Sequence, residues 1–463
     1  MYRSGILALK KSNIIITTAL FLIIAFLLFS FFQEMSMPQL VILPIGIYII
    51  LSVLIFILLN KIFKDKFISK IYLISVFLHF SFLLFWHIFK YYLLNYHLPS
   101  ENNFTPFIID NDGCLYHSLG VYIANNFSLE ILKEKFTGGL FPKIIGILYH
   151  FFGHNPFIPC LLNCLISGFT ATLFYQIGKI TLRNIKNAKI YSLFSIITFA
   201  HIMNTTVLMR DGYITIFMYL SLFLSYLLYK SKNIIYFLLT LLSCYSLYLF
   251  RPYAAFVIVF AIITTYIVLN VKIKMNKSKL KLNKIGLLLV LLSPLIISIL
   301  IYFLMQISNF MKIISVEDLI NIREASYAYG AAEVTIDFGS LYSKFFLLPF
   351  IIGYIYLFLA PFPWEWIYPR RMVYVTDMLA LYIFLPSFFR NIRYIFKEKR
   401  YFVVTFFFSI VYMFSIYCIT LGNTGAIHRL RGIFIPMIYL IAMTHPNKFL
   451  DKILNLVKKS NVI

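Results

Sequence analysis

Charged side chains are scarce in this chain of 463 residues: only 13% are Asp, Glu, Lys or Arg, whereas 61% are hydrophobic. Soluble domains carry about 25% charged and roughly 45–50% apolar residues. The apolar excess leaves room for about twelve membrane-spanning helices of about 20 residues each. A soluble enzyme, a fibrous protein and a disordered chain are therefore excluded, and the sequence predicts an all-α, polytopic transmembrane protein.

Acidic residues and familiar catalytic motifs are scarce as well. The 17 Asp and Glu against 41 Lys and Arg give a net charge of +24. The concentration of Lys and Arg in cytoplasmic loops explains this charge, and no nucleic-acid partner is expected. The five cysteines lack zinc-ligand spacing, and the sequence contains no phosphate-binding Gly-rich loop, no H-E-x-x-H and no G-x-S-x-G. No metal ligands are therefore assigned.

Apolar runs long enough to span a bilayer occur along most of the chain. They cover about 13–32, 39–60, 71–96, 156–180, 190–209, 212–229, 234–250, 253–271, 285–310, 374–389, 401–421 and 432–445. A full crossing by the further run 343–362 would put the basic segment 390–400 outside, against the positive-inside rule, so we interpret 343–362 as re-entrant or interfacial. We expect about twelve spans, or about thirteen if 343–362 crosses, with both termini on the cytoplasmic side of a plasma (inner) membrane.

This topology divides the chain into four parts. They are an N-terminal transmembrane hairpin (1–70), a core (71–310) containing a long acidic outer loop (97–155), a second outer loop with the re-entrant segment (311–373), and C-terminal spans with a basic cytoplasmic tail (374–463). Two amphipathic stretches of the first outer loop, 116–126 and 143–152, are expected to lie along the membrane surface as helices. Of the 17 acidic residues, only Asp65, Glu398 and Asp451 fall on the cytoplasmic side. This segregation indicates that the outer face binds a ligand or carries out chemistry.

The first candidate site lies just after the third span. Asp110 and Asp112 are two residues apart on an irregular turn, so both carboxylates can point at one site. One of them can instead cap the helix that begins near Leu115. We take Asp110 and Asp112 as catalytic candidates, and Tyr116 and His117 as candidates for substrate contact.

Arginines at outer helix ends form the second candidate group, because the positive-inside rule disfavours them there. They are Arg210, Arg251, Arg429 and Arg431. Each can snorkel at the interface, and Arg210 can pair locally with Asp211. Guanidinium groups also bind phosphate bidentately, and at a bilayer surface the phosphate belongs to a lipid. We predict substrate contacts by these arginines, by His428 beside the last pair, and by Glu365, which lies between two tryptophans.

An outer-face carboxylate beside guanidinium groups is typical of transfer from a lipid-linked phosphate donor. The carboxylate acts as general base on an acceptor hydroxyl, and the arginines stabilise the departing lipid phosphate. Attack from the side opposite the phosphate inverts the sugar carbon. Two carboxylates can also hold a divalent cation on the phosphate; beyond that open alternative, no cofactor is expected.

The order of these motifs resembles the GT-C glycosyltransferase superfamily, which includes protein O-mannosyltransferases and aminoarabinose transferases that use polyprenyl-phosphate sugars. The matching segments, spread over about 70–460, are 110–117 with Ala124, 209–212, 250–253, 361–366 and 422–431. The resemblance implies a GT-C-like fold, Asp110 or Asp112 as the base, and the outer arginines as phosphate ligands. In that family the acidic loop follows the first span, whereas here it follows the third, so 1–70 is expected to be an added hairpin.

The predicted function is therefore an inverting membrane glycosyltransferase that moves a sugar from a polyprenyl-phosphate-linked donor to a lipid, glycan or protein acceptor at the outer face. Two alternatives stay open. An O-antigen or capsule repeat-unit polymerase would use a diphosphate-linked oligosaccharide and several arginines in large outer loops, but the long loops here are more acidic than basic. A non-enzymatic lipid-sugar flippase or transporter would have a cationic cavity between inverted repeats, which the sequence does not reveal.

Overall fold

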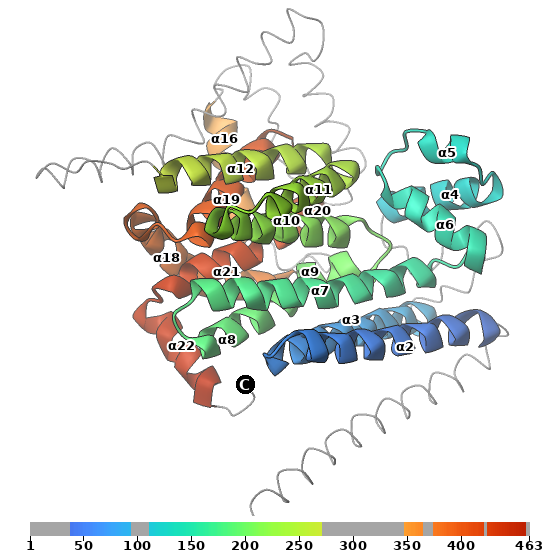
Figure 1. The fold of residues 1–463 in the computed structure, drawn as a ribbon, viewed down its shortest axis with the longest axis horizontal. Coiled ribbons are helices and arrows are strands. Elements are labelled where there is room, and N and C mark those ends of the chain that lie inside the picture. Colours follow the sequence, from blue (N-terminus) through green and yellow to red (C-terminus); the bar gives the residue numbers. More distant parts are fainter. Residues whose placement is uncertain (1–37, 94–110, 271–346, 364–373, 421–423, 460–463) are drawn as a thin grey trace, which may run out of the picture.

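In the computed structural model of the protein, the chain is described over residues 38–93, 111–270, 347–363, 374–420 and 424–459 (Figure 1). Within these residues every regular element is a helix, as the composition predicts. The predicted spans 13–32 and 285–310 and the loop 311–342 lie outside the described residues.

The helices are named in chain order. The N-terminal half contains α2 (Pro38–Ile62), α3 (Lys66–Leu93), α4 (Asn111–Asn125), α5 (Leu129–Lys133), α6 (Phe141–Phe152), α7 (Phe157–Thr181), α8 (Ile185–Ile196), α9 (Phe199–Thr206), α10 (Asp211–Ser231), α11 (Ile234–Phe250) and α12 (Pro252–Asn270). The C-terminal half contains α16 (Leu347–Leu359), α18 (Val375–Glu398), α19 (Tyr401–Thr420), α20 (Thr424–Gly432), α21 (Ile435–Thr444) and α22 (Lys448–Lys459).

Five of the described helices are long and apolar enough to cross a membrane: they lie in α2, α3, α7, α10 and α12. Shorter apolar helices accompany them in α6, α11, α19 and α21. These helices indicate a multi-pass membrane protein. The amphipathic stretches predicted in the first outer loop correspond to α4 and α6, which pack against each other.

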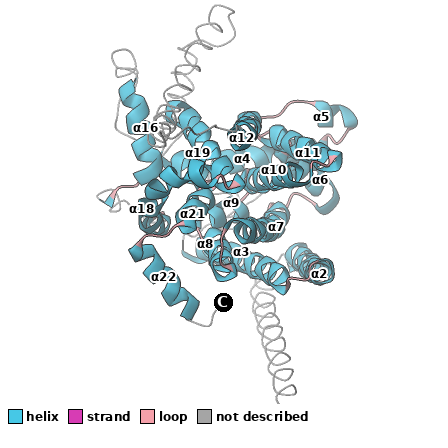
Figure 2. Ribbon diagram, turned by 60° about the vertical axis from the view of Figure 1, so that its left-hand side comes forward, coloured by secondary structure: helices cyan, strands magenta, loops and turns pink. Residues whose placement is uncertain are grey.

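Helix α7 occupies the middle of the bundle. It packs on α3 on one side and on α10 on the other, and α10 in turn contacts α11 and α12. Figures 1 and 2 show α2 and α3 side by side along one edge, and Figure 1 shows α4, α5 and α6 as a separate group at one end. α18, α19 and α21 close the bundle beside α8, α12 and α16.

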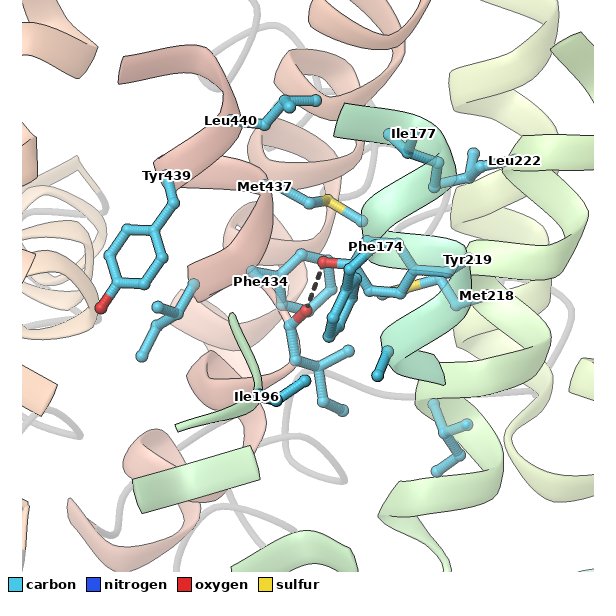
Figure 3. Close-up of a cluster of buried hydrophobic side chains, with 14 of the residues drawn as sticks. Phe174, Ile177, Ile196, Met218, Tyr219, Leu222, Phe434, Met437, Tyr439 and Leu440 are labelled. Carbon is cyan, nitrogen blue, oxygen red and sulfur yellow. Dashed lines mark hydrogen bonds between the residues drawn. The ribbon is translucent and has the colours of Figure 1, made fainter. Parts of the chain in front are cut away.

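The core where α7, α10 and α21 meet combines aromatic packing with one hydrogen bond (Figure 3). The Tyr219 hydroxyl donates to the carbonyl of Ile433 over 3.0 Å. The ring of Phe174 meets that of Tyr219 edge-to-face, with centroids 4.8 Å apart. The bond satisfies a hydroxyl that burial would otherwise leave without water.

A glycine sets the distance between α3 and α7. A Cβ at Gly168 would lie 2.6 Å from the ring of Tyr72 and from a methyl group of Val76. Beside it, the Ser75 hydroxyl donates to Ser167 over 3.2 Å. Small residues allow such close packing in membranes, where the lipid is as apolar as the side chains.

The predicted span 190–209 differs from the structure, because an interruption at Ile197 and Thr198 divides it into α8 and α9. The carboxylate of Asp377, on α18, accepts hydrogen bonds from the backbone N–H groups of Phe199 and Ala200, over 2.6 and 2.7 Å. These are first-turn donors that a helix leaves unsatisfied. The Asp377 side chain, 178 positions from Phe199, therefore supplies the hydrogen-bond acceptors that the interrupted helix lacks.

The predicted span 432–445 contains a second interruption, between α20 and α21. A Cβ at Gly432, the last residue of α20, would collide with the Cβ of Ala200. The two interruptions therefore lie against each other in the bundle.

Charged side chains gather at two ends of the bundle, which we call the Lys179 end and the Asp211 end. At the Lys179 end, Lys179 pairs with Asp65 over 2.6 Å, and Arg400 donates to the carbonyl of Thr181 over 3.0 Å. Burial would raise the pKa of Asp65, but hydrogen bonds from Lys179 and Tyr175 outweigh it and hold that pKa below its ordinary value. Asp65, Lys179 and Arg400 all belong to segments that the sequence assigns to the cytoplasmic side.

Candidate functional site

Asp211 lies at the centre of the Asp211 end. It opens α10, and its side chain is only 2% exposed. Its Oδ1 lies 3.1 Å from Nη2 of Arg251, and its Oδ2 lies 3.2 Å from Nε of Arg429. A buried carboxylate is costly unless its charge is compensated, and here one guanidinium group faces each oxygen. The α10 N-terminus adds a favourable dipole.

Arg429 also contacts the predicted catalytic loop. Its Nη1 lies 2.8 Å from Oδ2 of Asp112, whose side chain is 43% exposed. Asn204 holds the backbone at this point by donating to the carbonyl of Arg429 over 3.1 Å. Arg429 thus joins the first turns of α4 and α10. Asp112 belongs to that first turn of α4, and its Oδ1 makes no hydrogen bond with the described residues.

Arg251 terminates α11 and is buried, with 3% of its side chain exposed. Beyond its contact with Asp211, it stands over the ring of Tyr253 at 5.6 Å. Its Nε and Nη1 are buried and have no hydrogen-bond partner among the described residues. Buried donors without partners are costly, so Arg251 offers two N–H groups to an acceptor that this part of the chain does not supply.

The electrostatic surroundings keep Arg251 charged. Burial alone would lower the pKa of its guanidinium group, but Tyr253 and Asp211 raise it, and the pKa lies above its ordinary value. The charge is therefore available to a ligand at any physiological pH.

Arg210 borders the same group without pairing with its neighbour in sequence. Its Nη1 donates to the carbonyl of Phe250 over 3.0 Å, and its guanidinium lies 5.9 Å from the ring of Tyr116. Among the described ion pairs, those of Asp211 are with Arg251 and Arg429. The local Arg210–Asp211 pair that the sequence left open is not formed.

A glycine turn packs Tyr116 into the site. A Cβ at Gly138 would collide with the Tyr116 ring, and one at Gly139 would collide with the carbonyl of Leu249. The Tyr116 ring also meets Phe141 edge-to-face, with centroids 5.3 Å apart. Burial raises the pKa of Tyr116 to about 12, so its hydroxyl stays protonated.

His117 points to a different neighbour. Its Nδ1 lies 2.8 Å from the hydroxyl of Tyr149 on α6. Burial, followed by the charge of His154, lowers the pKa of His117, which favours the neutral ring. This predicted substrate contact therefore ties α4 to α6 and does not join the arginines.

Arg431 is two residues from Arg429 but takes part in a separate group. It is fully buried, and its Nη1 donates to the carbonyls of Leu357 and Ala360 at the end of α16, over 3.3 and 2.5 Å. Its Nη2 lies 2.8 Å from Nδ1 of His428. Residues i and i+2 of a helix face different sides, so α20 presents Arg429 to Asp211 and Arg431 to α16.

The structure brings together half of the predicted site residues: Asp112, Tyr116, Arg210, Arg251 and Arg429. Three others, His117, His428 and Arg431, have the separate contacts given above. Asp110 and Glu365 lie outside the described residues. Sequence reasoning missed the central role of Asp211; the available signal was an acidic residue directly after Arg210 at an expected outer helix start.

The two carboxylates, Asp112 and Asp211, are outnumbered by three guanidinium groups. The resulting positive charge, with the two unpaired nitrogens of Arg251, fits an anion that carries several acceptor oxygens. Among the described residues, no three His, Cys, Asp or Glu side chains are grouped so that they could hold a metal ion. No family model, curated protein or solved structure matches the chain.

Proposed function

We propose that the protein is a membrane glycosyltransferase of the GT-C type, which moves a sugar from a polyprenyl-phosphate-linked donor to an acceptor at the Asp211 end of the bundle. The observation that carries the proposal is Arg251, whose charge is only partly used by Asp211 and whose Nε and Nη1 are buried without partners in the described chain. Because the helices hold this site in a bilayer, a lipid-borne phosphate is the anion most available to it.

Arg251, Arg429 and Arg210 are the proposed phosphate ligands. Guanidinium N–H groups bind phosphate oxygens strongly. Nε and Nη1 of Arg251, which lie on different edges of its guanidinium, each offer a donor without a partner in the described chain. Asp211 positions Arg251 and Arg429 relative to each other because its two oxygens face one guanidinium each. Their charge favours departure of the phosphate, whose negative charge grows as the bond to the sugar breaks.

Asp112 is the proposed general base. Its Oδ2 contacts Arg429, while its half-exposed side chain leaves Oδ1 open to an acceptor. The acceptor oxygen forms a bond to the sugar C1, and its proton passes to Asp112. The bond from C1 to the phosphate oxygen breaks, its electrons leave with polyprenyl phosphate, and the configuration at C1 inverts. Asp110 stays the alternative base.

The guanidinium groups are proposed to meet the phosphate charge, and the position of Arg429 between Asp112 and Asp211 supports this assignment. A divalent cation held by Asp110 and Asp112 stays the alternative. The acceptor is a lipid, a glycan or a protein with a hydroxyl group. We place the Lys179 end in the cytoplasm and the Asp211 end at the outer face of the plasma membrane, in accordance with the positive-inside rule. The same rule assigns both chain termini to the cytoplasm.

A lipid-sugar flippase is the second candidate, and the interrupted helices favour it. Asp377 caps α9 where α8 ends, and Gly432 brings the α20–α21 interruption against it. Buried ionisable groups and broken helices often mark transport sites in membrane proteins. Such a protein would need the arginines but not a base, so the role of Asp112 separates the two functions.

The experiment is transfer by the purified full chain in proteoliposomes, with surface glycans of cells followed by mass spectrometry. Asp112→Asn is expected to lower transfer at least about 100-fold, because general-base catalysis contributes about 10²–10⁴-fold. The matched control is Asp65→Asn, which removes the ion-paired carboxylate at the Lys179 end and should leave transfer unchanged. Undiminished transfer by both Asp112→Asn and Asp110→Asn would overturn the enzymatic proposal. Transfer that requires a diphosphate-linked oligosaccharide would indicate the polymerase instead.

A further inference from the structure

The C-terminal helix α22 has two apolar stripes. Leu450 and Leu454 are fully buried against the bundle, where α22 contacts α8 and α18. Phe449 and Leu456, seven positions apart on the neighbouring face, are each 60% exposed. Seven residues make about two helical turns, so these two large side chains form one outward stripe.

Lysines border the outward stripe on one side. Lys448 and Lys452 are exposed there, whereas Lys458 lies on the opposite side of the helix, half-buried, with its Nζ 3.1 Å from the side-chain oxygen of Asn455. An exposed apolar stripe bordered by lysines on a helix of low mean hydropathy is typical of helices that lie in a membrane interface. The positive charge of these lysines attracts the negative headgroups of anionic lipids, so α22 is expected to bind an anionic membrane surface more strongly than a neutral one.

The start of α22 lies at the level where α18 stops being apolar. The backbone N–H of Asn447 donates to the hydroxyl of Ser387 over 3.0 Å, and Arg390 donates to the carbonyl of His445. Arg390 is the first basic residue of α18, directly after the apolar run 374–389. Figure 1 shows α22 beside α8, at the end of the bundle where α7 leads into α8, running steeply across the direction of α7. Lys179 lies in the last turn of α7.

From this placement we infer that α22 lies on the bilayer surface at the Lys179 end and binds anionic phospholipid headgroups. Phe449 and Leu456 enter the acyl boundary, and Lys448 and Lys452 contact the lipid phosphates. Asn447 fixes the angle of entry, since it bonds to α18 and its side chain also accepts from the N–H of Leu450 over 2.7 Å. This surface is independent of the proposed reaction at the Asp211 end.

The depth of the outward stripe is measured with the full chain in nanodiscs that contain brominated lipids. Phe449→Trp places a fluorophore on the stripe, and Asn455→Trp places one on the exposed polar face, with the spectrum of the parent protein subtracted. The expected result is at least twofold stronger quenching by bromolipid at position 449 than at position 455. Equal quenching at both positions, or stronger quenching of the residue at 449 by aqueous iodide, overturns the inference.

The lipid preference is measured by the retention of phosphatidylglycerol over phosphatidylcholine in native mass spectrometry of the same discs. The double variant Lys448→Gln, Lys452→Gln is expected to lose phosphatidylglycerol binding by on the order of fivefold per lysine. The control, Lys230→Gln with Lys232→Gln, removes the same charge from the exposed α10–α11 turn and should lose less. Equal losses in the two double variants would contradict a role specific to α22, as would docking of a soluble protein that displaces the lipid.

Discussion

Arg429 and Asp112 are 317 positions apart in the chain, yet the Nη1 of one lies 2.8 Å from the Oδ2 of the other. The same Arg429 contacts Asp211 through Nε over 3.2 Å. The two carboxylates differ in burial, at 43% exposed for Asp112 and 2% for Asp211. Asp112 can therefore turn to water or to an acceptor, whereas Asp211 cannot leave its arginines.

This difference predicts opposite effects of two isosteric substitutions on phosphate binding. Asp112→Asn removes a competitor for Arg429, so the affinity for polyprenyl phosphate should rise about tenfold, in line with the loss of one charge-assisted bond. Asp211→Asn removes the counterion that positions Arg251 and Arg429, so the affinity should fall at least about tenfold. The measurement is equilibrium binding of polyprenyl phosphate to the full chain in detergent.

Asp65→Asn serves as the control for these two variants, since its carboxylate pairs with Lys179 at the opposite end. Changes of the same sign for Asp112→Asn and Asp211→Asn would show that Arg429 is not shared in the way described. If Asp112→Asn loses transfer but binds polyprenyl phosphate with unchanged affinity, Asp112 is the base but does not compete with the phosphate for Arg429.

Asp377 should be a major contributor to the stability of the interrupted helix. Asp377→Ala removes both acceptors for the N–H groups of Phe199 and Ala200, and we expect a loss of about 2 kcal/mol in the free energy of unfolding. The measurement is the apparent melting temperature in detergent. Asp451→Ala, at an exposed first-turn position of α22, should change it far less, and an equal decrease in both variants would contradict the capping role.

The contact between His117 and Tyr149 predicts a pH dependence. An unfolded histidine titrates near about 6.5, and burial holds the pKa of His117 below its ordinary value in the folded protein. Below about pH 6.5 the unfolded chain therefore binds a proton that the folded chain does not, and stability falls as the pH decreases toward the folded pKa. Above about pH 7.5 this group contributes no pH dependence.

His117→Gln should accordingly reduce the drop in melting temperature between about pH 7.5 and about pH 5. His150→Gln changes another histidine between the same two helices, whose Nδ1 lies 3.3 Å from the carbonyl of Ala124. An unchanged pH profile in His117→Gln, or the same change in both variants, would mean that protonation of His117 does not oppose folding.

The turn beside Tyr116 provides a matched pair of glycines. Gly139 has φ +68°, and a Cβ there would collide with the Leu249 carbonyl; Gly153 has φ +82° with open space around it. Both Gly→Ala variants carry backbone strain of about 1 kcal/mol or more. Gly139→Ala should in addition displace the turn from the end of α11 and weaken polyprenyl phosphate binding several-fold. Equal binding by the two variants would show that the turn does not support the position of Arg251.

Much of the helical architecture follows from the sequence because apolar runs and basic clusters are local signals. The described chain is helical, as predicted, and five of its helices are long and apolar enough to span a membrane. The interruption at Ile197 and Thr198 was not predictable in this way. It contains neither proline nor glycine, and its stabilising partner, Asp377, comes from a helix far along the chain.

The candidate site was predictable in its residue types but not in its pairing. Positive-inside reasoning singled out Arg210, Arg251, Arg429 and Arg431 together. The structure separates Arg431 from the others because α20 is helical and turns its side chain toward α16. The central position of Asp211 depends on two arginines that lie 40 and more residues away, and local sequence carries no record of that proximity.

Binding of polyprenyl phosphate to the purified full chain, compared between the wild type and Arg251→Gln, tests the central claim most directly. Gln keeps much of the side-chain volume of Arg251 but removes the charge and the two nitrogens, Nε and Nη1, that have no hydrogen-bond partner in the described chain. We expect saturable binding by the wild type and a loss of at least about tenfold in the variant, with binding weakened by added inorganic phosphate. Absence of binding by the wild type, or equal affinity of the two proteins, would contradict a phosphate site at the Asp211 end.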